Sequence, residues 1–155
     1  MASTTFSGPV TSTNGFIGAL TGNVTGNIAG TGRITHATTA AINATATATA
    51  AQVATGYITS TSAAGTAITL PTGTLLGAAL GAAQGTIFDL YVDNTAGAST
   101  VTMVVAVNGI LSAGAADIGS GVAFGLLTVP SGVTGLACFR IMFSSATAYA
   151  FSRIA

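Results

Sequence analysis

The sequence predicts an all-β fold: an extended, repetitive N-terminal arm, residues 1–54, followed by a jelly-roll-like β-sandwich or related barrel, residues 55–155. Glycine recurs about every fourth residue in much of the arm, and long apolar runs are almost absent there. Beyond residue 54, strand-length segments rich in apolar residues are separated by Gly, Pro, Asn and Asp, which is the pattern of consecutive short strands. About 100 residues are enough to bury one such core.

The centre of the arm carries two consecutive repeats, TGNV at residues 21–24 and TGNI at residues 25–28. Leu20, Val24 and Ile28 have helical spacing, but each glycine costs a helix interior about 0.8–1 kcal/mol. Tight turns and short extended pieces are therefore favoured, with Gly supplying positive φ and Asn supplying local hydrogen bonds. The few large apolar side chains do not offset the entropy of ordering the arm, so we expect other chains to order it.

Residues 44–50 alternate alanine and threonine, with the sequence ATATATA. In a strand, a period of two places the threonines on one face and the alanines on the other. A packed strand or a linker is the expected structure. The alternative is a flat hydroxyl array, as on an ice-binding face.

Seven strands and one short helix are expected in the β-domain. Leu75, Leu76, Ala79 and Leu80 share helical spacing and predict the helix, although two glycines interrupt it. The turn at residues 93–97 is expected to join the third and fourth strands as a β-hairpin, with Asp and Asn at its corner. The expected strands are residues 56–60, 66–70, 86–92, 99–107, 122–129, 136–143 and 148–153.

Charge is nearly absent from this chain. Only six of 155 side chains are formally charged, the net charge is zero, and neither lysine nor glutamate occurs. Soluble domains hold roughly 25% charged residues, so the 4% found here predicts a poorly soluble monomer whose surface is covered in an assembly. No basic run is present that would bind a nucleic-acid backbone. We also expect no membrane span, because no run of about 20 apolar residues occurs, and no export, because no secretory signal is visible.

The chain offers almost no residues for catalysis or metal binding. Its side-chain carboxylates are Asp89, Asp93 and Asp117, and the first two would lie about 13 Å apart along a strand, too far to share a proton transfer. Cys138 is expected to be a small buried core residue, and the single histidine, His36, stands in a polar stretch. We expect no catalytic, cofactor or metal site and no enzyme; the alternative is a metal site built from three copies of His36 or Asp117.

The N-terminal segment TFSGPVTSTNGF, residues 5–16, and the TGNV and TGNI repeats resemble the openings of tailed-bacteriophage virion proteins. Residues 67–71 (AITLP) and 86–95 (TIFDLYVDNT) are similar to the outer β-domain of the same class, which includes capsid decoration, or cement, proteins. The resemblance implies a homotrimer, made in the host cytoplasm, that binds the major capsid protein on the outer surface of the virion. Nucleic acid and membrane are not expected as partners.

The function that the resemblance implies is to bind and stabilise the assembled phage head. A short head or tail fibre that recognises a host surface is the alternative among virion proteins, and an ice-binding or adhesive surface module is the alternative of another class. The large apolar side chains of the arm are expected to make the capsid or intersubunit contacts: Phe6, Val10, Phe16, Ile17, Leu20, Val24 and Ile28.

Overall fold

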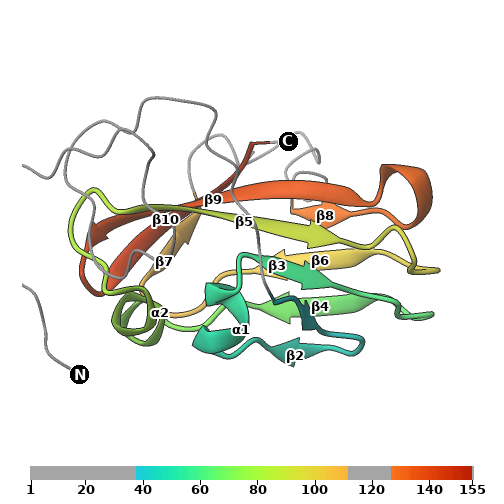
Figure 1. Ribbon diagram of the computed structural model, residues 1–155, viewed down its shortest axis with the longest axis horizontal. Coiled ribbons are helices and arrows are strands. Elements are labelled where there is room, and N and C mark those ends of the chain that lie inside the picture. The colour runs from blue at the N-terminus through green and yellow to red at the C-terminus, as the bar shows by residue number, and fades with distance from the viewer. Residues whose placement is uncertain (1–37, 112–126, 155) are drawn as a thin grey trace, which may run out of the picture. The chain divides into compact units, whose positions relative to one another are not determined.

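The computed structural model describes residues 38–111 and 127–154, which belong to one compact unit beginning at Thr35. Its strands form two sheets, and two short helices lie next to each other at one end of the strands (Figure 1). In chain order the elements are β1 (Ala40–Ala41), β2 (Ala46–Thr47), α1 (Ala50–Ala54), β3 (Tyr57–Thr59), β4 (Thr66–Thr69), α2 (Gly73–Leu80), β5 (Ile87–Asp93), β6 (Val101–Val104), β7 (Gly109–Leu111), β8 (Thr128–Val129), the 3-10 helix η1 (Gly132–Thr134), β9 (Leu136–Ser145) and β10 (Ala148–Arg153).

Consecutive strands alternate between the two sheets from β1 to β8. The six-stranded sheet, here sheet A, has the order β1-β3-β5-β9-β10-β7, and the four-stranded sheet, here sheet B, has the order β2-β4-β6-β8. β1, β3 and β5 are parallel, as are β2, β4 and β6, whereas β9 is antiparallel to both β5 and β10. Parallel neighbours need a crossover connection, and in this fold the strand in the opposite sheet lies within that connection.

The expected jelly-roll-like, all-β fold is wrong. Both sheets mix parallel and antiparallel pairs, and two α-helices are present. The expected hairpin is also wrong, because β5 pairs with β3 and β9 in sheet A, whereas β6 pairs with β4 and β8 in sheet B. Alternation of apolar residues determines which side chains share a face of a strand, but it does not determine which strands become neighbours.

Most expected strands are nevertheless confirmed. β3, β4, β5, β9 and β10 form close to the expected segments, β6 is shorter than expected, and β8 is the described part of the expected strand at residues 122–129. The helix expected from residue 75 to residue 80 is α2. The strands β1 and β7 and the helix α1 were not expected, and β2 is a two-residue strand within residues 44–50, where a packed strand or a linker was expected; each of the four has five residues or fewer.

The helix α2 contains glycine where it packs closely against a neighbouring turn and where it ends. Thr72 caps its N-terminus by accepting a hydrogen bond from the Leu75 N–H at 3.3 Å, and Gly81, at φ +58°, ends it in the left-handed conformation. A Cβ atom at Gly77 would clash with the backbone of the turn between β9 and β10, at the carbonyl of Ala146. The missing side chain therefore allows the helix to approach this turn closely.

The alanine–threonine segment forms two short elements instead of one continuous strand. The Thr45 hydroxyl accepts a hydrogen bond from the Ala67 N–H at 3.1 Å, and Thr49 forms a capping box with Gln52 at the start of α1. β2 covers only two residues. The hydroxyls of Thr45 and Thr49 thus make local hydrogen bonds, and the segment does not form the single strand on which a continuous hydroxyl array would depend.

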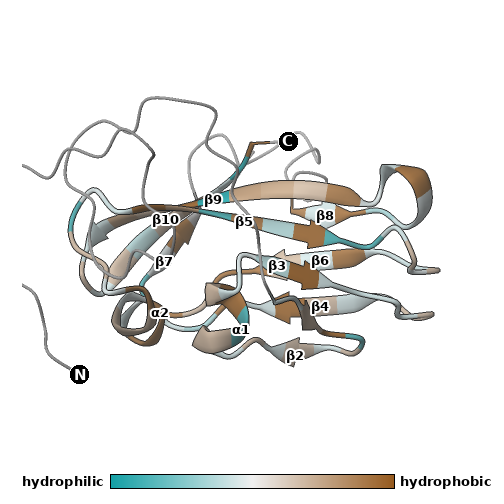
Figure 2. Cartoon of the chain, in the orientation of Figure 1, coloured by the Kyte–Doolittle hydropathy of each residue, from teal (hydrophilic) through white to brown (hydrophobic). Residues whose placement is uncertain are grey.

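One apolar core is shared by both sheets and both helices. Residues 40–54, from the end of the expected arm, contribute to this core through Ala40, Ile42, Ala48 and Val53, so they belong to the compact fold. Figure 2 shows apolar residues recurring along strands of both sheets, including β5, β6 and β9. The largest buried side chains from the strands are Ile58, Ile68, Leu90, Met103, Phe139, Ile141, Phe143, Tyr149 and Phe151.

Polar contacts also hold the two sheets together. Asn94, which follows β5, is buried, and its Nδ2 atom donates to the carbonyl oxygens of Ser99 at 2.8 Å and Val129 at 3.0 Å. Arg153 on β10 donates from Nη1 to the carbonyl oxygen of Thr128 on β8 at 2.8 Å. Asp93 and Asn94 therefore begin the connection that crosses from β5 in sheet A to β6 in sheet B, and they are not the corner of the expected hairpin.

Candidate binding surface

The arm residues expected to make contacts lie outside the described part of the chain. These are Phe6, Val10, Phe16, Ile17, Leu20, Val24 and Ile28. His36 and Asp117 also lie outside it, so their expected roles stay predictions.

Within residues 38–111 and 127–154, no group of three or more His, Cys, Asp or Glu residues could hold a metal ion. In the same ranges, no helix has both the length and the apolar character required to cross a bilayer.

One face of sheet A carries side chains that do not enter the shared core. Along β5, Leu90 and Val92 point into the core while Ile87, Asp89 and Tyr91 alternate with them and stay at least partly exposed. The same alternation continues across β9 and β10. We call this the outer face; it is formed by Tyr57, Thr59, Ile87, Asp89, Tyr91, Asp93, Ile110, Leu136, Cys138, Arg140, Met142, Ala150, Ser152 and Ile154.

An uninterrupted apolar row crosses four strands of the outer face. Ile87 on β5 is the register partner of Met142 on β9, Met142 is the partner of Ala150 on β10, and Ala150 is the partner of Ile110 on β7. Ile87, Met142 and Ile110 are 55%, 47% and 63% exposed. Single exposed apolar residues are ordinary on protein surfaces, whereas contiguous ones mark interaction sites. We call these four residues the apolar row.

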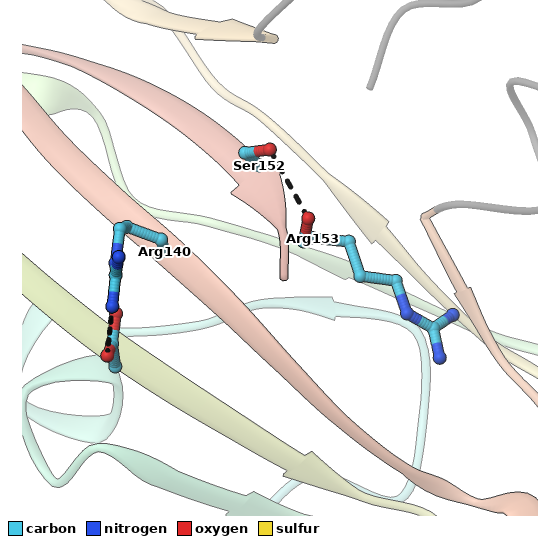
Figure 3. A network of polar contacts seen from close by, with 4 residues as sticks. Arg140, Ser152 and Arg153 are labelled. Atoms are coloured by element: carbon cyan, nitrogen blue, oxygen red, sulfur yellow. Dashed lines mark hydrogen bonds and ion pairs between the residues drawn. The ribbon is translucent and has the colours of Figure 1, made fainter. Parts of the chain in front are cut away.

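The next row of the outer face is an ion pair within the sheet. Arg140 on β9 and Asp89 on β5 are register partners, and the guanidinium binds the carboxylate through Nε–Oδ1 at 2.7 Å and Nη2–Oδ2 at 2.8 Å (Figure 3). The hydrogen bonds from Arg140 lower the pKa of Asp89, and those to Asp89 raise the pKa of Arg140. The two charges are thus neutralised next to the apolar row.

Two tyrosines occupy the following row. Tyr57 on β3 and Tyr91 on β5 are partners in a parallel pair, with ring centroids 6.4 Å apart and ring planes inclined by 24°. The Tyr57 hydroxyl donates to Asp93 Oδ2 at 2.8 Å. Asp93 Oδ1 also accepts from the N–H of Thr95 at 2.9 Å and from its hydroxyl at 2.6 Å. Hydrogen bonds from Thr95, and then from Tyr57, lower the pKa of Asp93, while the bond to Asp93 raises the pKa of Tyr57.

Cys138 lies beside these tyrosines. It is the register partner of Tyr91 and is buried, as expected, but it lies outside the core shared by the two sheets. Burial raises the pKa of its thiol, so the reactive thiolate is disfavoured. This cysteine therefore fits a packing role within the outer face.

The outer face holds five of the nine large apolar side chains that are exposed in the described ranges: Ile87, Ile110, Leu136, Met142 and Ile154. The remaining four belong to α2, β6, η1 and the connection before β7. Tyrosine, methionine and arginine, all present on this face, are enriched at protein–protein interfaces. The arrangement is therefore suited to binding a flat and weakly charged protein surface.

Sequence reasoning did not identify this face. The available signal was that β5 and β9 carry apolar residues on both sides, since Ile87 and Met142 stand at the positions that alternate with the core residues. Their meeting in one row depends on the strand register, which the sequence pattern does not supply.

No protein-family model, curated protein or solved structure matches this chain.

Proposed function

We propose that this chain is a capsid decoration, or cement, protein that binds and stabilises the assembled head of a tailed bacteriophage. The observation that carries the proposal is the outer face, where exposed apolar side chains gather on a chain with only six formal charges. A contiguous apolar surface of this kind marks a site that another protein covers. The resemblance of residues 5–28 to virion proteins indicates the setting: a homotrimer bound to the major capsid protein on the outer surface of the virion.

The physical properties of the chain suit a repetitive lattice. Once one subunit of an oligomer docks, the remaining subunits bind at a high effective concentration, so weak contacts add up to a strong attachment. Near-absence of charge also makes attachment less sensitive to salt, because few attractions are screened. Both properties favour a structural role over the chemistry of an enzyme.

The roles of the two parts of the chain differ in this proposal. The apolar side chains of the arm, from Phe6 to Ile28, contact the capsid and neighbouring subunits, whereas the unit from Thr35 onward forms the outer domain. Deleting residues 1–30 should leave a folded protein that no longer binds phage heads. Unchanged binding by the truncated protein, measured by co-sedimentation with heads, would refute this assignment.

Copy number per virion tests the proposed function. Quantitative mass spectrometry of purified particles should give a number that approaches stoichiometry with the major capsid protein. A few copies per particle, combined with binding of the protein to host cells, would instead support the head or tail fibre alternative.

A further inference from the structure

We propose that copies of this chain bury the outer face of sheet A against one another, with the apolar row at the centre of the contact. This inference rests on the proposed function as an assembly subunit and names the partner of the outer face: another copy of the same face. The row consists of Ile87, Met142, Ala150 and Ile110, which are aligned by register across four strands.

The outer face supplies about half the area of a standard interface, which suits a weak contact that is strengthened when several copies assemble. Strands are spaced about 4.8 Å apart, and outward side chains recur about every 6.8 Å along a strand. The fourteen residues of the outer face therefore span a footprint on the order of 450 Å², at about 33 Å² for each, compared with about 800 Å² per partner in a standard interface. The apolar row and the tyrosine row together extend over five strands of sheet A.

The charged side chains of the outer face indicate the kind of partner that it can bind. Asp89 and Arg140 neutralise each other within the face, and Asp93, at the end of β5, is already bound by Tyr57 and Thr95. A strongly charged partner would have its own charges desolvated without compensation. The outer face of a second copy has matching properties. Its apolar row can pack against the apolar row of the first copy, and its Asp89–Arg140 pair is neutralised within its own sheet.

The side chains on the face are of the kinds that contribute most to protein binding. Arg140 lies in the row of the ion pair, Tyr57 and Tyr91 lie together in the next row, and tyrosine and arginine are frequent hot-spot residues. Tyr57 is bound to Asp93, and Arg140 is held by two hydrogen bonds. Side chains that are already fixed lose less entropy when a partner covers them.

The test is the mass of the full-length protein by light scattering over a range of concentrations. The wild-type protein should form an oligomer, and Met142→Glu and Ile87→Glu should each raise its dissociation constant by roughly 30- to 100-fold, because a carboxylate would be buried without a partner. Leu75→Glu is the matched control: Leu75 is 59% exposed on α2, outside the face, and its replacement should leave the mass unchanged.

Circular dichroism shows whether each variant is folded. If a glutamate variant does not fold, Met142→Thr keeps a residue suited to a strand while removing the long apolar side chain, and it should still weaken association. A monomeric wild-type protein, or folded Met142 and Ile87 variants that associate as tightly as the wild type, would overturn the inference.

These results are separable from those of the proposed function. An oligomer that depends on Met142, in a protein present at only a few copies per virion, would retain this inference and refute decoration. A monomeric protein that nevertheless coats heads stoichiometrically would support decoration and refute this inference. A face-dependent dimer would support the contact and exclude the homotrimer.

Discussion

Asn94 links the two sheets through its side chain. It is buried, and its side-chain amide donates to carbonyl oxygens of Ser99 and Val129. Asn94→Ala should lower the free energy of unfolding by about 2–4 kcal/mol, because the buried Val129 carbonyl and the partly buried Ser99 carbonyl lose a donor. Urea denaturation measures the change.

Asn43→Ala is the control for this prediction. Asn43 is exposed and accepts a single hydrogen bond from the Thr61 N–H at 2.8 Å. Its replacement should cost less than about 1 kcal/mol, because water can satisfy the freed N–H group. Equal losses for the two variants would contradict the role given to Asn94.

Asp89 and Asp93 make stability depend on pH in the acid range. Hydrogen bonds from Arg140 and Thr95, respectively, lower their pKa values in the folded protein below the ordinary value of 3.8. The unfolded chain therefore binds more protons in this range, so the stabilisation is fully present above about pH 5 and is lost as pH falls through the folded pKa values.

Chemical denaturation between about pH 2 and pH 6 checks this prediction. The free energy of unfolding of the wild-type protein should fall as the pH is lowered below about 4. The double variant Asp89→Asn, Asp93→Asn should be less stable at neutral pH and should show a smaller slope. The prediction fails if the two proteins lose stability in parallel on acidification.

At the scale of elements, α2 shows how a tertiary contact outweighs helix propensity. Alanine is favoured over glycine in a helix by roughly 1 kcal/mol, yet Gly77→Ala should destabilise the protein because the added Cβ meets the backbone of Ala146. Thr74→Ala, at an exposed position of the same helix, should be neutral or slightly stabilising. Thermal unfolding of both variants would reveal the opposite signs, and a more stable Gly77→Ala protein would contradict the close contact.

Elements could be predicted from the sequence where local patterns determine them. The strand-length apolar segments at residues 86–92 and 136–143 predicted β5 and β9, and the spacing of Leu76 and Leu80 predicted α2. The two-residue strand β1 has no room for a periodic pattern, and the alternation of residues 44–50 did not indicate that only two of them would form a strand, β2. The pairing of β5 with β3 and β9 depends on contacts between distant segments. The turn residues at 93–97 predicted a hairpin, but they connect strands in different sheets.

The whole molecule combines strands that alternate between two sheets with a nearly uncharged surface. Its candidate site consists of residues that are far apart in the sequence, Ile87, Ile110, Met142 and Ala150, and only the registers of β5, β9, β10 and β7 bring them into one row. Composition alone predicted that the surface must be covered in an assembly. It could not indicate which surface, because exposed apolar positions become contiguous only after the strands have paired.

Oxidation of Met142 tests most directly whether other copies cover the outer face. Met142 is 47% exposed, whereas Met103 is 1% exposed in the core and serves as a reference within the same chain. Hydroxyl-radical labelling, read by mass spectrometry, should oxidise Met142 readily at high dilution and at least several-fold more slowly at concentrations where the protein has assembled, because the thioether is then covered. Met103 should react slowly at all concentrations. Equal oxidation of Met142 in the dilute and the assembled protein would contradict the account.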